Sequence, residues 1–168
     1  FVAEFVGTPA GSGIHGFRLK PKGASFEFQD SKKMLGNVLA TGMDCGPDGA
    51  MYLADWIDGW GTKDNGRIWK LDVDSPNVAE RKETEKEIRA DFKAYKDAEL
   101  KQRLYHADMR VRQKAQFELF ARGNAGLDIF KSVLADRSNQ LARVHAIWGI
   151  SQFARVSLSQ TTRIDLRR

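Results

Sequence analysis

The chain has 168 residues and a formal net charge of +5, which is enough sequence for one domain or two small ones. It contains a single cysteine, Cys45, so an internal disulfide and a CxxCH haem attachment site are both excluded. No stretch approaches the ~18 consecutive apolar residues of a membrane-spanning helix, and we expect no transmembrane segment in this sequence.

The charge is unevenly distributed along the sequence. Residues 1–78 carry 8 Lys and Arg against 10 Asp and Glu, a balance of −2, whereas residues 79–168 carry 19 against 12, a balance of +7. A basic half can indicate binding to nucleic acid or to an anionic membrane. Here the basic residues alternate with acidic ones and form no continuous Lys/Arg run. We therefore predict no nucleic-acid binding and interpret these residues as the solvated faces of helices.

The first part of the sequence alternates between apolar and polar residues in the way that β-strands do. Residues 1–6 form an apolar run, Phe17 and Leu19 alternate with basic residues, and Phe26 and Phe28 alternate with polar ones. We expect half-buried antiparallel strands with one apolar face. Because the sequence begins inside an apolar run, we also expect it to be part of a longer protein.

The stretch from 37 to 72 predicts a wider hairpin. Residues 45–49 contain Pro47 and Gly49, which favour a tight turn. Residues 51–55 then alternate as a strand, residues 58–66 form a polar, glycine-rich loop, and residues 67–71 alternate again. Strand, wide loop and strand are typical of one blade of a β-propeller. The preceding segment, 35–41, is apolar enough to be another strand or a short buried segment.

The composition changes near residues 74–77. We interpret residues 77–96 as a charged linker, although its part from 80 to 87 is equally compatible with the start of a helix. Helical periodicity begins at Asp97, and Asp108 is placed to cap the next helix. Two further helices are predicted over residues 127–134 and 139–154. The second and fourth of these helices are apolar on two faces, so we expect both to be covered on two sides.

The helical part contains an internal echo. Aligning Arg112 with Arg143, an offset of 31 residues, matches small residues with small ones and aromatic residues with aromatic ones. The matched pairs are Ala115 with Ala146, Phe117 with Trp148, and Leu119 with Ile150. The offset predicts a helical-hairpin repeat slightly shorter than the common HEAT period. We thus expect an α-helical HEAT/ARM-like region over residues 97–155 and an irregular tail over residues 156–168.

Acidic residues gather around the predicted hairpin, and two of them stand at the ends of strands. Asp44 and Asp55 are therefore candidates for oxygen ligands of Ca²⁺. The spacing matches no known calcium loop. The alternative is structural: Asp48 would satisfy the amides of the turn, and Asp55 would brace the loop that follows its strand.

Two further residues of the hairpin are candidates for holding a cofactor. Arg67 begins a strand, where its planar fork could grip an acidic cofactor. It could equally pair with Asp55 or Asp58 within the hairpin. Trp56 could stack on a flat ring or a sugar, or could serve as packing, which is the more common use of such aromatic residues in propeller blades.

Four blocks of the sequence, in this order, carry a resemblance to a known family. They are HGFRLKPKGASFEF at 15–28, GPDGAMYLADW with GRIWKL at 46–71, HADMRVRQKAQFELFARG at 106–123, and LARVHAIWGISQFAR at 141–155. The set resembles the membrane-bound dehydrogenase or haem-binding proteins of planctomycete-type bacteria. In that family a six-bladed propeller, similar to the TolB-like soluble glucose/sorbosone dehydrogenases, precedes HEAT-like repeats and a separate cytochrome c domain.

The resemblance implies an α+β protein in two segments, with residues 1–76 as the C-terminal part of an antiparallel β-propeller. It also implies a periplasmic or membrane-associated location. The parent would oxidise a sugar or polyol with pyrroloquinoline quinone and Ca²⁺, and haem c would lie in a separate domain. The family pattern places an Asp near position 42 and an aromatic residue near position 45, where this chain has Gly42 and Cys45.

The resemblance also suggests a role for His15. In related quinoproteins a histidine takes the alcohol proton while hydride passes to the quinone, and general-base catalysis suits an imidazole near neutral pH. The alternative is an ordinary loop or packing histidine. For the whole chain two functions stay open. One is a fragment of a sugar or polyol dehydrogenase that is inactive alone. The other is a non-catalytic scaffold that binds glycans, or protein partners on its helical repeats.

Overall fold

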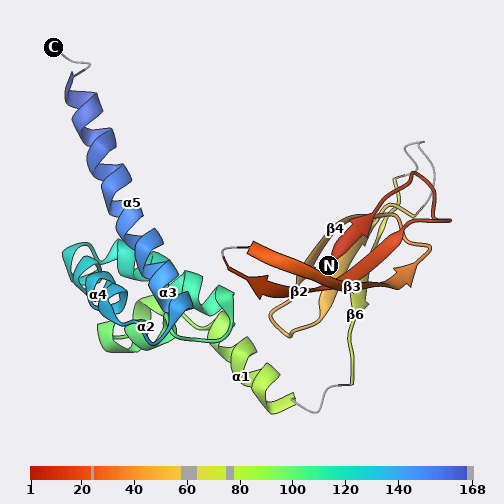
Figure 1. Cartoon of the computed structure of the whole chain (residues 1–168), viewed down its shortest axis with the longest axis horizontal. Helices are drawn as coiled ribbons and strands as arrows, with labels where there is room; N and C mark the ends of the chain where they lie inside the picture. Colours follow the sequence, from red (N-terminus) through yellow and green to blue (C-terminus); the bar gives the residue numbers. More distant parts are fainter. Residues whose placement is uncertain (24, 58–63, 75–77, 166–168) are drawn as a thin grey trace. The chain divides into compact units, whose positions relative to one another are not determined.

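The structure is a computed structural model that describes residues 1–23, 25–57, 64–74 and 78–165, with side chains described up to residue 156. The chain divides into two compact units, Phe1–Lys82 and Glu83–Arg168, and each is described by itself. The described part is α+β, with two three-stranded antiparallel sheets followed by five α-helices (Figure 1). The predicted order, strands first and helices after, is confirmed.

The first sheet contains β1 (Val2–Glu4), β2 (Gly13–Lys22) and β3 (Ser25–Gly36), in that order. Both neighbouring pairs are antiparallel. The three strands coincide with the three alternating runs of the sequence. β2 and β3 form a long hairpin, because strands that follow one another directly pair readily across a short turn.

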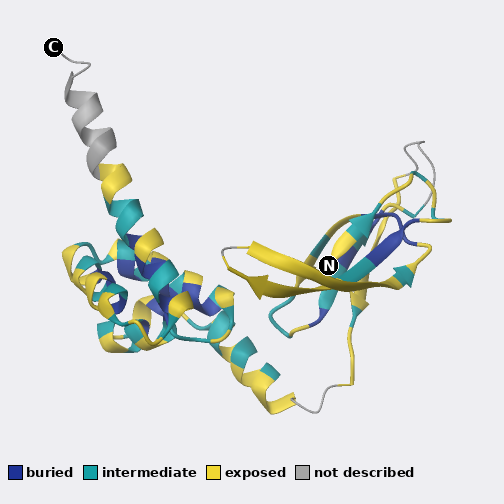
Figure 2. Ribbon diagram, in the orientation of Figure 1, coloured by how far each residue is buried: buried dark blue, intermediate teal, exposed yellow. Residues whose placement is uncertain are grey.

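The outer part of the β2–β3 hairpin is exposed on both faces (Figure 2). Leu19 lies opposite Phe28 and Pro21 opposite Phe26, and the two phenylalanines are 60% and 62% exposed. The prediction of half-buried strands is therefore wrong for this part of the hairpin. Alternation gave these strands one apolar face, but no described element of the first unit covers it. Only the base of the hairpin, at Ile14, reaches the core.

The second sheet contains β4 (Ala40–Cys45), β5 (Met51–Asp55) and β6 (Arg67–Leu71), in that order and antiparallel. The predicted turn joins β4 to β5: Gly46 N–H donates to the Ala50 carbonyl at 2.8 Å, and Gly49 has a φ of +77°. The segment 35–41, predicted as a strand or a short buried segment, is divided between the end of β3 and the start of β4, and Val38, Leu39 and Ala40 within it are buried. The predicted wide loop falls between β5 and β6, and its residues 58–63 lie outside the described part.

A small core lies where the two sheets meet. Its buried members are Ile14 from β2, Val38, Ala40 from β4 and Leu53 from β5. Partly buried apolar side chains surround them: Ala3, Leu35, Met43, Met51 and Leu71. The described strands thus form two separate, open antiparallel sheets, and no closed ring of blades is present among them.

The helices are α1 (Val78–Arg89), α2 (Asp97–Arg103), α3 (Met109–Ala121), α4 (Asn124–Ala135) and α5 (Gln140–Asp165), with a short 3₁₀ turn over Phe92–Ala94. None of the described helices is long and apolar enough to cross a membrane.

Residues 80–87, predicted as a linker or as the start of a helix, belong to α1, so the helical alternative is confirmed and the linker over 77–96 is wrong along α1. The described residues of α1 include none that is buried, and Arg89 pairs with Glu85 at 2.9 Å. Such pairs four residues apart favour a helix in a sequence with few apolar residues. The prediction of an irregular tail is wrong as far as Asp165, because the backbone of α5 continues to that residue.

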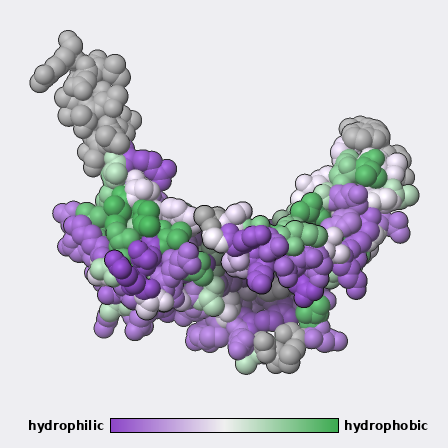
Figure 3. Space-filling model, viewed as in Figure 1, coloured by the Kyte–Doolittle hydropathy of each residue, from purple (hydrophilic) through white to green (hydrophobic). Residues whose placement is uncertain are grey.

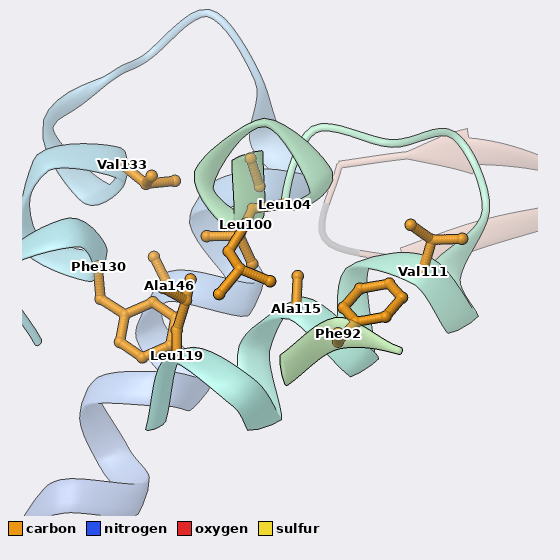
Figure 4. Close-up of a cluster of buried hydrophobic side chains, with 10 residues drawn as sticks. Phe92, Leu100, Leu104, Val111, Ala115, Leu119, Phe130, Val133 and Ala146 are labelled. Carbon is orange, nitrogen blue, oxygen red and sulfur yellow. The ribbon is translucent and has the colours of Figure 1, made fainter. Parts of the chain in front are cut away.

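The core of the second unit is formed by side chains from the 3₁₀ turn and from α2, α3, α4 and α5 that point toward one another (Figure 4). The buried members are Phe92, Leu100, Leu104, Val111, Ala115, Leu119, Phe130, Val133, Ala142 and Ala146. The expectation that α3 and α5 are covered on two sides fails, since Phe117, Leu141, Ile147 and Trp148 are exposed.

Residues matched by the 31-residue sequence repeat have similar roles in the two hairpins. Asp108 caps α3 by accepting from Arg110 N at 2.8 Å, and Asn139, 31 residues later, accepts from Ala142 N at 2.9 Å at the start of α5. Ala115 and Ala146 are both fully buried. In both hairpins, α2–α3 and α4–α5, the second helix thus begins with a capping side chain and buries an alanine at the matched position.

Candidate functional site

The end of β5 holds a buried carboxylate with four hydrogen-bond donors. Asp55 Oδ1 accepts from the backbone N–H of Leu39 at 3.1 Å and of Ile57 at 2.9 Å. Its Oδ2 accepts from Trp69 Nε1 at 2.8 Å and from Arg67 Nε at 3.1 Å. The Asp55 side chain is only 2% exposed. A buried charge of this kind is stable only when its oxygens are hydrogen-bonded and a countercharge is close.

The same contacts set the protonation state of Asp55. Burial raises the pKa of its carboxyl, but the hydrogen bonds from Trp69, Ile57 and Leu39 and the charge of Arg67 together outweigh burial. The pKa therefore lies below its ordinary value of 3.8, and Asp55 is ionised at neutral pH.

Strand register explains why these groups meet. Asp55 lies directly opposite Arg67 in the β5–β6 pair, and Trp69 is two residues further along β6. Side chains two residues apart in a strand share a face, so Arg67 and Trp69 both reach the carboxylate. Their own contact, with the guanidinium 4.9 Å from the centre of the Trp69 ring, adds a cation–π interaction.

The backbone after β5 is strained. Ile57 has a φ of +76°, which is unfavourable for a β-branched residue. The bond from Ile57 N–H to Asp55 Oδ1 helps to hold this conformation. Strained residues persist where the surrounding structure fixes them, and they concentrate at binding sites.

An open depression of about 470 Å³ lies beside the Asp55 cluster. Its volume falls within the ~300–1,000 Å³ of small-molecule sites. The lining residues come from β4, β5, β6 and the segments next to them: Thr41, Ala54, Asp55, Trp56, Asn65, Gly66, Arg67 and Ile68. Three of the five residues predicted from sequence, Asp55, Trp56 and Arg67, are thus brought together here.

Arg67 presents part of its side chain to this depression. Its Nε is bonded to Asp55, which confirms the structural alternative of an Asp55–Arg67 pair, and its side chain is 46% exposed. Within the described part of the chain, neither terminal nitrogen of this guanidinium makes a hydrogen bond. The fork is therefore oriented by one contact and keeps donors for a ligand.

Trp56 both packs and contributes to the lining. Its ring lies 6.1 Å from the Phe5 ring at an interplanar angle of 39°, and about a third of the residue is exposed. A residue exposed to this extent adds apolar surface to the lining of the depression.

The other two predicted residues lie elsewhere in the first unit. Asp44 faces Tyr52, three residues from Asp55 along β5 or about 10 Å at the usual rise per residue, and its carboxylate accepts from Cys45 N at 2.7 Å. The two carboxylates therefore do not converge on one ion. The described residues contain no group of three or more His, Cys, Asp or Glu side chains placed to hold a metal.

His15 is on β2 in the first sheet, not in a loop. Its Nε2 lies 2.8 Å from Glu4 Oε2, and the same oxygen accepts from Lys33 Nζ at 3.1 Å. The histidine is therefore engaged in a surface cluster of charged side chains, and it does not line the depression.

Asp48 plays the structural role predicted for it. Its Oδ1 accepts from Ala50 N at 3.2 Å, and its Oδ2 contacts Lys70 at 2.7 Å and Tyr52 Oη at 2.9 Å. The hydrogen bond from Lys70 is the largest of the causes that lower the pKa of Asp48 to about 2.

Sequence reasoning missed Thr41 and Asn65 as lining residues. Asn65 precedes Gly66 at the end of the predicted loop, a position from which functional side chains often project, so this signal was present. Thr41 gave no such signal, because only the pairing of β4 with β5 places it there.

Comparison of the chain with protein-family models, with curated proteins and with solved structures finds no match. The geometry of the site is accordingly the basis for the function proposed next.

Proposed function

We propose that the first unit binds a small acidic molecule in the depression beside Asp55, as one wall of a quinoprotein-like sugar or polyol dehydrogenase of which this chain is a part. The observation that carries this proposal is the state of Arg67. Asp55 holds the guanidinium by Nε, while its other nitrogens remain available beside Trp56. Because Asp55 neutralises the charge of Arg67, recognition rests mainly on two parallel N–H donors that match a carboxylate.

The same proposal assigns the two sheets to a β-propeller and the helical hairpins to a HEAT-like repeat. Three-stranded antiparallel sheets with exposed apolar faces suit blades that neighbouring blades cover. The equivalent caps at Asp108 and Asn139 suit a helical repeat, in which each hairpin repeats the contacts of the previous one.

Pyrroloquinoline quinone suits the depression in size and chemistry. Its carboxylates match the guanidinium of Arg67, and its flat ring system suits an aromatic lining residue such as Trp56. When bound, the quinone supplies the acceptor for hydride. The residues described here hold and orient such a molecule but supply no adjacent base, since His15 is engaged with Glu4 in the first sheet. The contribution of this chain to the proposed activity is therefore binding.

A glycan is the second candidate ligand, and the polar groups of the same depression favour it. Thr41 and Asn65 offer a hydroxyl and an amide beside Trp56, and aromatic rings with neighbouring hydrogen-bonding groups suit sugars. In this case the chain acts as a binding scaffold. An acidic sugar would use Arg67 as the quinone does, whereas a neutral sugar would not.

Calorimetric titration of the full chain distinguishes these ligands. Pyrroloquinoline quinone, galacturonate and glucose are titrated separately into the wild type and into Arg67→Lys, which keeps the charge beside Asp55 but loses the fork. We expect saturable binding of the quinone and a loss of about tenfold in affinity in Arg67→Lys, or ~1.4 kcal/mol. Arg18→Gln, which alters an exposed arginine paired with Asp30 on the first sheet, is the matched control and should bind normally.

Each other outcome has a defined meaning. Binding of galacturonate or glucose without the quinone would replace the dehydrogenase proposal by the glycan scaffold. Absence of saturable binding, or equal affinity in Arg67→Lys and wild type, would overturn the assignment of the depression as an acidic-ligand site.

A further inference from the structure

A groove between α3 and α5 forms a second potential site, in the second unit. From α5 it is lined by His145, Trp148, Ser151, Gln152 and Arg155, and from α3 by Met109, Gln113, Gln116 and Phe117. Residues 145, 148, 152 and 155 are spaced by three and four, so they form one stripe of the helix. The stripe extends over about 15 Å at the usual rise of a helix.

The groove is too small for a cofactor. Its volume is about 210 Å³, below the ~300–1,000 Å³ of typical small-molecule sites. At ~30 Å³ for each water it holds about seven waters, which is room for one large side chain. A groove of this length and volume suits a short peptide segment that inserts one residue.

The floor of the groove is a fixed polar network. His145 Nδ1 lies 2.8 Å from Gln116 Oε1, and Gln116 Nε2 donates to Gln152 Oε1 at 3.0 Å. Because the Gln116 oxygen only accepts, this network places the imidazole proton on Nδ1 and leaves Nε2 as an acceptor. In the described part, Arg112 Nε is the one buried side-chain nitrogen or oxygen without a partner. His145 Nε2 also makes no hydrogen bond within the described residues, yet it is not among the buried atoms without a partner. It is therefore accessible, and His145 lines the groove.

The acceptor persists at neutral pH. His145 is 3% exposed, and burial, followed by the charge of Arg112, lowers the pKa of its imidazole to about 4. A ligand group that donates a hydrogen bond is thus favoured at Nε2. The amide nitrogen of Gln152 is the corresponding donor further along the floor.

Two aromatic side chains form the walls. Phe117 and Trp148 are 50% and 51% exposed, and the Trp148 ring stands edge-on to His145 at 5.1 Å. They are equivalent positions of the 31-residue repeat. A side chain that packs between the two hairpins would be buried at the first of these positions, so exposure at both shows that this face lies on the surface. Figure 3 shows hydrophobic atoms gathered around the lower part of α5.

The charge of the groove selects the partner. Arg155 is the one charged side chain that lines it, and among the described residues it has no ion pair. The acidic residues of α3 and its cap are already paired, Glu118 with Arg122 and Asp108 with Arg110. A ligand with a carboxylate is therefore attracted at the Arg155 end, and a basic one is not.

We propose that this groove binds a short acidic segment of a partner protein. One large apolar side chain of the segment lies between Phe117 and Trp148, a main-chain or side-chain N–H donates to His145 Nε2, and a carboxylate pairs with Arg155. Tryptophan and arginine beside a small pocket are among the residue types that carry most of the affinity at protein interfaces. This site is independent of the ligand proposed for the first unit.

Selection of peptides tests the proposal. A phage-displayed library of random twelve-residue peptides (about the length of three helical turns) is selected on the full chain. We expect enrichment of peptides with a large apolar residue and an Asp or Glu three or four positions away. The affinity of a synthetic consensus peptide is then measured by fluorescence anisotropy for the wild type, Trp148→Ala, Arg155→Gln and Arg137→Gln. Arg137 is an exposed arginine outside the groove and serves as the matched control.

We expect at least a tenfold loss of affinity for Trp148→Ala and about tenfold for Arg155→Gln, with no change for Arg137→Gln. Replacing the acidic residue of the peptide by its amide should remove the difference between Arg155→Gln and wild type, because the pair is then already broken. Because Trp148 and Arg155 are exposed, both variants should keep the wild-type circular dichroism spectrum. Enrichment of basic peptides, binding that Trp148→Ala leaves intact, or a library that yields no specific peptide would overturn the proposal.

Discussion

Arg112 and Arg143, 31 residues apart on α3 and α5, each donate to main-chain carbonyl oxygens that precede their own helix in the chain. Arg112 Nη1 donates to the carbonyls of His106 at 2.7 Å and Ala107 at 2.6 Å, just after α2. Arg143 Nε donates to the carbonyl of Leu134 at 3.2 Å, in the last turn of α4. Carbonyls in the last turn of a helix have no partner within that helix, so Arg143 satisfies a group that α4 leaves open. Arg112 instead binds two carbonyls of the connection between α2 and α3.

The two arginines should differ in their contribution to stability. Arg112 is buried and makes two bonds, whereas Arg143 is partly exposed and makes one. We expect Arg112→Ala to lower the free energy of unfolding by about 3 kcal/mol and Arg143→Ala by about 1 kcal/mol, because lost bonds from buried charged donors cost more. Urea unfolding followed by far-ultraviolet circular dichroism measures both. An equal or reversed order would contradict the argument that burial and the second hydrogen bond make Arg112 the more stabilising of the two.

Asp55→Asn should destabilise the first unit strongly. All four partners of Asp55 are donors, and an amide offers one acceptor oxygen where the carboxylate offers two. We expect a loss of about 3 kcal/mol or more, as for other broken buried pairs. Tryptophan fluorescence during urea unfolding reports this change, since Trp69 contacts Asp55 directly. Asp44→Asn is the control: its carboxylate is exposed and has one backbone donor, so a loss as large as that of Asp55→Asn would contradict the account.

The second unit should lose stability as the pH falls below the pKa that the imidazole of His145 has in the unfolded chain. The imidazole of His145 takes up a proton near its ordinary pKa of 6.5 when unfolded, but only near about 4 when folded. Between these values the unfolded state binds more protons. The free energy of unfolding therefore decreases with falling pH, by up to about 1.4 kcal/mol for each pH unit.

His145→Gln should flatten this dependence, because an amide can keep the bond to Gln116 and does not titrate. Thermal unfolding of the full chain, followed by far-ultraviolet circular dichroism at several pH values, measures the slope. His15→Gln, in the first unit, should leave the slope of the helical transition unchanged. An unaltered slope in His145→Gln would assign the acid sensitivity to other groups.

Gly126→Ala should destabilise the second unit, although alanine usually stabilises a helix relative to glycine by ~0.5–1 kcal/mol. A Cβ at position 126 would overlap the main-chain carbonyl of Leu119, where α4 crosses closely beneath α3. A clash with backbone has no flexible neighbour to relieve it, so we expect a net loss of about 2 kcal/mol. Asn124→Ala, at the exposed start of α4, is the control and should change stability by less than about 0.5 kcal/mol. Stabilisation by Gly126→Ala would contradict the close approach.

Turns and helix starts could be predicted from the sequence where neighbouring residues decide the local structure. Pro47 and Gly49 predicted the turn, and Asp108 predicted the start of α3. Gly126 is a case that neighbouring residues do not decide. It lies inside α4 because a Cβ at that point would overlap the main-chain carbonyl of Leu119.

The site was predictable in part. Asp55, Trp56 and Arg67 lie close in sequence on one hairpin, so a strand–loop–strand pattern brings them to one edge of the sheet. Asp44 lies on the same hairpin but at its other end, and the antiparallel register alone decides this. The α3–α5 groove depends on residues about thirty positions apart, as in the bond between His145 and Gln116, and no local pattern announces it.

The sequence by itself determined the kinds and order of the elements: alternating strands, one turn, capped helices and a 31-residue echo. These follow from backbone preferences and short-range hydrogen bonds, which act between residues a few positions apart. The tertiary structure alone decided which apolar faces are covered, that Asp55 is buried among four donors, and that His145 opens onto a groove. These depend on long-range packing, because the burial of a side chain is fixed by elements that are distant in the chain.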